Sequence, residues 1–195
     1  MTDWPRARRW NAGGLAVATL YLAWTVAAQQ WMEQRAWAAV EREGLHVERL
    51  LATPTALNSL LWRIVAVGED RHWESLHPVV SDRPMRFRAY EREPELLKPL
   101  ADHQPVQRLQ YFTRGFYTVE ARDGHVVISD LRMGQVGFYA FAYRVGSLEN
   151  GFPEPTRDRR YRFERPPLPI ALGDLFNCAL GRPTRAVHCL APTAD

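Results

Sequence analysis

The chain has 195 residues, of which 46% are hydrophobic and 24% are charged, and its formal net charge at pH 7 is +3. This length and composition suffice for one domain with a buried core plus an appendage, and they exclude collagen-like and low-complexity chains. With 2 cysteines the chain is neither a disulfide-dense scaffold nor a four-cysteine zinc protein. Its small positive excess does not predict nucleic acid as a partner.

The first predicted element is a membrane anchor. Residues 12–28 carry no charge, and the uncharged residues as far as Met32 lengthen this apolar run to what a helix needs to cross a bilayer. Trp10 precedes the run and Trp31 closes it, as expected for indole rings in the two headgroup regions. Three arginines come before the run, namely Arg6, Arg8 and Arg9. By the positive-inside rule, residues 1–32 form a cytoplasmic stub and a single-pass anchor, and the rest lies outside the cytoplasm.

Two other interpretations of the same segment stay open. Val26-Ala27-Ala28 before Gln29 resembles a small-residue cleavage site, so the segment could instead be a cleaved signal peptide. Against this, the apolar run is longer than a usual signal-peptide core. The segment could also be a buried helix of a soluble domain.

A helical connector is predicted for residues 33–53, which are rich in Ala, Glu, Gln, Arg and Leu. Pro54 should end it, because a residue that precedes proline avoids helical dihedrals. Residues 60–67, 72–81 and 85–90 are then predicted as strands from their β-branched and aromatic content or their alternation.

Two short helices are expected next, at residues 95–102 and 105–110. The clearest local signal is a hairpin, because Asp123-Gly124 lies between the β-rich segments 116–121 and 125–131. Short turns between neighbouring strands favour antiparallel pairing.

These elements predict an α+β protein, in which a transmembrane helix precedes a mostly antiparallel sheet domain with short helices. The sheet domain should cover residues 54–149, with a further strand at 138–145. Residues 150–195 are rich in Pro and Arg and are expected to form a surface loop or tail, with a last short helix at 173–179.

Metal and nucleophile motifs are missing from the sequence. Its 6 histidines form no HxxxH, HExxH or HxH pattern, and there is no GxSxG or glycine-rich phosphate loop. We therefore predict no metal ligands and name no catalytic residue. His72 and His77 should face opposite sides of a strand. Cys178 and Cys189 are either a disulfide, if the domain lies outside the cytoplasm, or two unrelated thiols.

Arginines cluster within residues 83–92 and 157–165, with aromatic residues between them. For an anchored domain, such clusters fit anionic lipid headgroups or an acidic partner. The sequence favours the alternative that these arginine clusters form a solvated face.

The candidate substrate-binding residues form one charged cluster. Asp130 and Arg132 are two residues apart and so project from one face of a strand. Arg114 or Arg63 could join them from a neighbouring strand, and Asn58 lies in a turn before a tryptophan. The functional interpretation is a site for an anion or a headgroup. The alternative, which the residues favour, is a structural Arg–Asp–Arg bridge that clamps strands together.

Three segments of the chain resemble one bacterial inner-membrane family. They are PTALNSLLWRIVA at residues 54–66, FTRGFY at 112–117, and DGHVVISDLRMG at 123–134. The most specific piece is SDLRMG, and with the preceding apolar helix the resemblance runs over residues 10–147. The family is that of the membrane-bound metal-dependent hydrolases (YdjM-like), whose C-terminal half these segments resemble.

The resemblance implies a location in the bacterial inner membrane, with a periplasmic domain, and a relationship to hydrolases that use a divalent metal. Family members usually carry their histidine motifs in several membrane helices at the N-terminal end, to which this chain has no matching positions. The resemblance then implies one of two situations. Either the chain is a truncated relative, or a partner half with several membrane helices is encoded separately. The chain would be part of a membrane hydrolase acting on a lipid or phosphoester. Alternatively, it is a non-catalytic envelope module that binds a partner protein or an anionic headgroup.

Overall fold

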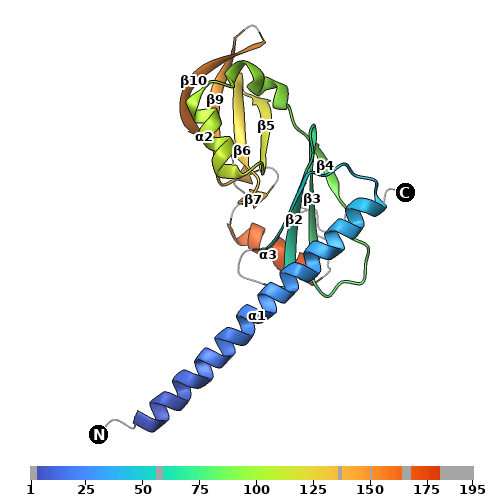
Figure 1. The fold of residues 1–195 in the computed structure, drawn as a ribbon, viewed down its shortest axis with the longest axis vertical. Coiled ribbons are helices and arrows are strands. Elements are labelled where there is room, and N and C mark those ends of the chain that lie inside the picture. Colours follow the sequence, from blue (N-terminus) through green and yellow to red (C-terminus); the bar gives the residue numbers. More distant parts are fainter. Residues whose placement is uncertain (1–3, 56–58, 136–137, 150, 164–167, 181–195) are drawn as a thin grey trace.

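The computed structural model describes residues 4–55, 59–135, 138–149, 151–163 and 168–180. A long N-terminal helix is followed by two four-stranded antiparallel sheets and by short helices (Figure 1). The predicted α+β class is therefore confirmed.

The N-terminal helix α1 spans Trp4–Arg42 and has two different surfaces along its length. The described side chains before Ala28 are exposed or half-buried, whereas beyond it one face is buried against the first sheet. That face consists of Ala28, Met32, Ala36, Ala39 and Val40. Their spacing of three to four residues keeps them on one side of a helix. Within the described residues, this is the one helix long and apolar enough to cross a membrane.

The first sheet has the strand order β1-β2-β3-β4, with all neighbours antiparallel. Its strands are β1 (Arg49–Pro54), β2 (Leu61–Val67), β3 (Arg71–Pro78) and β4 (Arg88–Glu91). Every residue of β2 is buried. Alternate residues of this strand, Trp62 and Ile64, join the core under α1, while Val65 and Val67 join a cluster on the opposite face.

The second sheet has the order β10-β9-β6-β5. Its strands are β5 (Tyr117–Arg122), β6 (His125–Asp130), β9 (Ala142–Glu149) and β10 (Phe152–Tyr161). The predicted hairpin joins β5 to β6. Asp123 and Gly124 have φ angles of 50° and 71°, the left-handed backbone that a two-residue turn of this kind requires. A short pair, β7 (Gly134–Gln135) and β8 (Phe138–Tyr139), follows β6.

The described part of the chain also contains three short helices. The helices η1 (Pro94–Leu100) and α2 (Gln104–Thr113) contribute Leu97, Leu100 and Val106 to the core of the second sheet. Helix α3 (Leu168–Ala179) packs on the first sheet beside the start of β2 (Figure 1).

Two local predictions are wrong. The helical connector expected over residues 33–53 ends at Arg42, and β1 follows it, because Leu50 and Ala52 are buried against α1 and β1 pairs along its whole length with β2. The segment after residue 150, expected as a loop or tail, contains the strand β10. It lies at a sheet edge, and its pairing with β9 shifts register between Pro155 and Arg159. Edge strands tolerate prolines and charges that would exclude a segment from a sheet centre.

Candidate functional site

The two sheets meet at a buried ion pair. Arg63 on β2 donates through Nε to Glu74 Oε2 on β3 at 3.0 Å and through Nη2 to Glu74 Oε1. Its third nitrogen, Nη1, donates to the carbonyl oxygen of Leu131, just beyond β6, at 2.6 Å. The Arg63 and Glu74 side chains are 6% and 11% exposed, so the pair is screened little by solvent. It therefore couples the middle of the first sheet to the end of a strand in the second.

A tyrosine and a histidine extend this pair into a buried network. The Tyr139 hydroxyl donates to Glu74 Oε1 at 3.2 Å and lies 3.2 Å from His72 Nε2. Because the hydroxyl proton is directed at Glu74, the hydroxyl accepts from His72, whose Nε2 then carries the proton. The other ring nitrogen, Nδ1, is buried and has no hydrogen-bond partner among the described residues.

The network keeps both its histidine and its tyrosine neutral. Burial, followed by the charges of Arg92 and Arg63, lowers the pKa of His72 from 6.5 to about 3. Burial, followed by the negative charge of Glu74, raises the pKa of Tyr139 well above its ordinary value. The charged members of this network are therefore Arg63 and Glu74, which neutralise each other.

The predicted pair of Asp130 and Arg132 forms a second ion pair, close to the first. Asp130 Oδ1 accepts from the Arg132 backbone N–H at 2.9 Å, and Oδ2 accepts from Nη2 at 2.6 Å. Asp130 is 3% exposed, and the Arg132 guanidinium lies 4.8 Å from the ring centroid of Phe112. The carboxylate thus holds the arginine against the end of α2, and it leaves little of the guanidinium charge uncompensated.

The other predicted site residues are placed differently. Arg63 lies near Asp130 through Leu131, but its ion-pair partner is Glu74. Arg114 is the exposed C-cap of α2, and within the described residues its side chain makes no hydrogen bond or ion pair with Asp130 or Arg132. Asn58 lies outside the described residues. A role for these residues in substrate binding stays a prediction.

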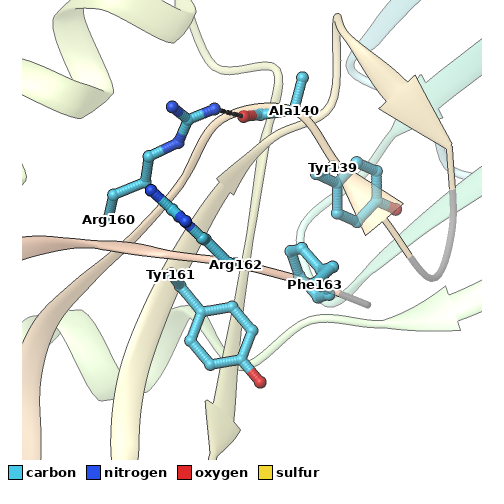
Figure 2. Close-up of a pocket in the computed structure, with 6 residues that line it drawn as sticks. All are labelled: Tyr139, Ala140, Arg160, Tyr161, Arg162 and Phe163. Atoms are coloured by element: carbon cyan, nitrogen blue, oxygen red, sulfur yellow. Dashed lines mark hydrogen bonds between the residues drawn. The ribbon is translucent and has the colours of Figure 1, made fainter. Parts of the chain in front are cut away.

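A cavity of about 400 Å³ opens beside this junction, between β8 and the end of β10. Figure 2 shows its lining, which consists of Tyr139, Ala140, Arg160, Tyr161, Arg162 and Phe163. Arg160 Nη2 donates to the carbonyl oxygen of Ala140 at 3.0 Å. The ring of Phe163 packs edge-on against Tyr139 and Tyr161, at centroid distances of 5.9 and 5.0 Å. Two guanidinium groups and three aromatic rings therefore line the cavity, and its described lining residues include no carboxylate.

A second cavity, of about 430 Å³, lies between α2 and the second sheet. Its walls are mostly aromatic and aliphatic, with Asp130 among them: Arg108, Leu109, Phe112, Thr113, Ile128, Asp130, Phe141 and Tyr143. Because the Asp130 carboxylate is already bound by Arg132, this cavity presents mainly an apolar surface.

Sequence reasoning missed Glu74, Tyr139 and the arginine-lined cavity. Glu74 and His72 share a face of β3 because they are two residues apart, and this signal was available from the alternation of the strand. The pairing of Tyr139 with them, 65 residues along the chain, had no local signal. Arg160 and Arg162 belong to the arginine cluster for which the sequence favours a solvated face, whereas in the structure both line the cavity at the end of β10.

The described residues do not form a metal site. No group of three His, Cys, Asp or Glu side chains that could hold a metal ion occurs in the described part of the chain. His72 and His77 are both buried, yet they face opposite sides of β3, as the sequence predicted: His72 contacts Tyr139, and Arg35 of α1 acts on His77. We assign no step to a metal in these residues. Cys178 is buried on α3 and is disulfide-bonded, which favours the disulfide over two unrelated thiols; Cys189 lies outside the described residues.

The fold and cavities define an α+β protein whose N-terminal helix could cross a membrane and whose body has an arginine-lined cavity at the junction of two sheets. The chain matches no protein-family model, no curated protein and no solved structure.

Proposed function

We propose that this chain is a membrane-anchored, non-catalytic module that binds an anionic group in the cavity between β8 and β10. The single observation that supports the proposal is the charge of the cavity wall. Arg160 and Arg162 line it, whereas none of the lining residues that the structure describes is acidic. The arginines at Glu74 and Asp130, by contrast, are already neutralised by those carboxylates.

The chemistry of the lining suits a phosphate or carboxylate group attached to an apolar body. A guanidinium presents a planar fork of donors that matches the oxygens of such groups. The Tyr139 and Phe163 rings offer apolar walls, and a volume of about 400 Å³ lies in the range of small-molecule sites. The Tyr139 hydroxyl is held by Glu74, so the wall of the cavity is attached to the first sheet.

For location, we propose that α1 spans the bacterial inner membrane with the body in the periplasm. The arginines before the apolar run favour this orientation. The lipid membrane is then one partner, and the anionic ligand is either a lipid headgroup or a free anion of the same chemistry.

The relationship to the YdjM-like hydrolases is a second proposal, in which the chain is one part of a membrane hydrolase. One observation favours it: the resembling segments converge in space. Arg63, from the segment at 54–66, contacts Leu131, from the segment at 123–134, and the Leu131 backbone N–H donates to Phe116, from the segment at 112–117, at 3.0 Å. The metal would come from the separately encoded half with several membrane helices, so co-purification of that half with metal tests this proposal.

Calorimetric titration of the detergent-purified chain tests anion binding. The probes are inorganic phosphate and a water-soluble, short-chain phosphatidylglycerol, with the matching phosphatidylcholine as the zwitterionic control. Binding of phosphate and of the anionic lipid would indicate a general anion site, whereas binding of the lipid alone would indicate a headgroup site.

Arg160→Ala/Arg162→Ala should weaken binding on the order of tenfold or more, because a hydrogen bond to a charged group contributes about 1.5–3 kcal/mol. The matched control is Arg157→Ala/Arg159→Ala, which removes the same charge from β10, at two positions that do not line the cavity. Equal losses in both variants would mean that binding follows net charge alone, and the proposal would be wrong. Absence of binding to either anionic probe would also overturn it.

A further inference from the structure

A rim of exposed apolar side chains lies at one end of the first sheet. We define the rim by Leu60, Val80, Phe176 and Leu180, whose exposed fractions are 49%, 74%, 65% and 52%. A contiguous exposed apolar surface on a folded protein marks a site that contacts a membrane or a partner protein.

These side chains come from three segments that converge. The Val79 backbone N–H donates to the Leu60 carbonyl oxygen at 2.7 Å, so the residue before β2 lies beside the residues that follow β3. On α3, Leu175 and Cys178 pack against Leu61, the first residue of β2. Phe176 of α3 and Leu180, the residue that follows the helix, are four residues apart, and the Leu180 backbone N–H donates to the Phe176 carbonyl oxygen at 3.2 Å, so both lie on one side of the helix end.

The rim lies at the end of the sheet that faces the N-terminal half of α1. Strand β1 follows α1 through a short turn and runs back along it, and Gln29 Nε2 of α1 donates to the Ala52 carbonyl oxygen of β1 at 3.3 Å. From Ala52 to Thr55 the extended chain continues about 10 Å in the same direction. The Thr55 backbone N–H donates to the Leu61 carbonyl oxygen at 2.9 Å, which places Thr55 beside the start of β2. The rim residue Leu60 directly precedes that start, so the rim lies at this end of the sheet.

The expected boundary of the bilayer lies close to this end of the sheet, measured along the axis of α1. The uncharged part of α1 from Trp10 to Trp31 is about 30 Å long at 1.5 Å per residue, which matches the hydrocarbon thickness. Trp31 is 55% exposed, as an indole in the headgroup layer would be. The sheet end therefore descends from the boundary by about 10 Å, a depth at which apolar protein surfaces lie in the headgroup and acyl boundary.

The exposed charges beside the rim are of both signs. Asp82 and Arg83 are exposed in the segment just after Val80, and an arginine at this place can reach lipid phosphates. At the end of α3, the exposed side chains of Phe176 and Leu180 are apolar.

We infer that the rim of Leu60, Val80, Phe176 and Leu180 inserts into the headgroup layer of the bilayer, as a second membrane contact beside α1. This inference rests on the anchoring by α1 under the proposed function. Two contacts would seat the body on the membrane, with α3 lying in the plane of the interface.

Photo-crosslinking of the full chain in phosphatidylcholine and phosphatidylglycerol vesicles tests the rim. The photoreactive residue p-benzoylphenylalanine is placed singly at Val80 and at Phe176, and lipid adducts are measured by mass spectrometry. Leu20, in the middle of the apolar run, reports on anchoring, and Phe152 and Tyr111 are equally exposed controls on the second sheet and α2. All five positions are exposed, so the label should not disturb the core.

We expect lipid adducts from positions 20, 80 and 176 and none from 111 or 152. Adducts at position 20 without adducts at 80 and 176 would overturn the rim and leave the anchor standing. Failure at position 20 would overturn the anchor and the rim together. Crosslinks from 80 or 176 to a second copy of the chain instead of lipid would show that the rim is a protein interface, which also overturns the inference.

Discussion

The Nη1 atom of Arg63 donates to the carbonyl oxygen of Leu131 at 2.6 Å and so joins the central part of the first sheet to the end of β6 in the second. The same guanidinium is held in place by Glu74, which also accepts the Tyr139 hydroxyl. One buried arginine thus sets the position of two segments, those of Leu131 and Tyr139, that border the cavities.

Replacement of Glu74 should be strongly destabilising. Glu74→Gln leaves the Arg63 charge buried without a counter-charge, a change that costs about 3–5 kcal/mol. The free energy of unfolding is measured by urea titration of the chain in detergent micelles. Glu120→Gln, which removes the same charge from the more exposed pair with Arg122, is the matched control and should cost less than about 1 kcal/mol. Equal costs for the two variants would contradict a structural role for the Arg63–Glu74 pair.

Protonation of His72 should make the folded state sensitive to mild acid. The unfolded chain takes up this proton near pH 6.5, whereas in the folded state the pKa of His72 is about 3. The stabilisation is therefore complete above pH 6.5 and is lost as the pH falls from 6.5 toward 3, by up to about 1.4 kcal/mol per pH unit.

Urea titrations at several pH values between 7 and 4 measure this slope. Burial and the charge of Arg35 lower the pKa of His77 to about 4, so His77 contributes to the slope in the same direction. The comparison of His72→Gln with the parent therefore isolates the contribution of His72. His72→Gln should lose less stability between pH 6.5 and 4 than the parent does. An unchanged slope in His72→Gln would refute the assignment.

Removal of Arg132 should leave anion binding almost unchanged. Its guanidinium is occupied by Asp130, so Arg132→Ala should alter phosphate affinity by less than about twofold, a change of less than about 0.4 kcal/mol. The titration with inorganic phosphate is the same as for Arg160→Ala/Arg162→Ala. A tenfold loss in Arg132→Ala would move the anion site to the cluster of Asp130 and Arg132 that the sequence suggested.

The elements that the sequence predicted correctly depend on local signals. The charge-free run of α1, the Asp123-Gly124 turn and the two faces of β3 can each be derived from residues within one element. The ion pair of Asp130 and Arg132 is also local, but the two residues do not share a strand as predicted: β6 ends at Asp130, and Arg132 lies in the turn that follows it.

The parts that were missed depend on pairing between distant segments. Strand β1 has the composition of a helix and becomes a strand because β2 and α1 bury Leu50 and Ala52. Strand β10 carries prolines and arginines and is stable only as the edge partner of β9. The arginine-lined cavity needs both β8 and β10 in place, so composition alone could not locate it.

One unbroken helix, Trp4–Arg42, supplies both the hydrophobic run and the buried face under the first sheet. No loop separates these two roles, so the body is not free to swivel as it would on a flexible tether. From Ala28 to Arg42 the helix rises about 21 Å. This length sets how far the first sheet extends along the helix axis from Ala28. Any change in helix tilt, for example in a thinner membrane, would lean the whole first sheet by the same angle.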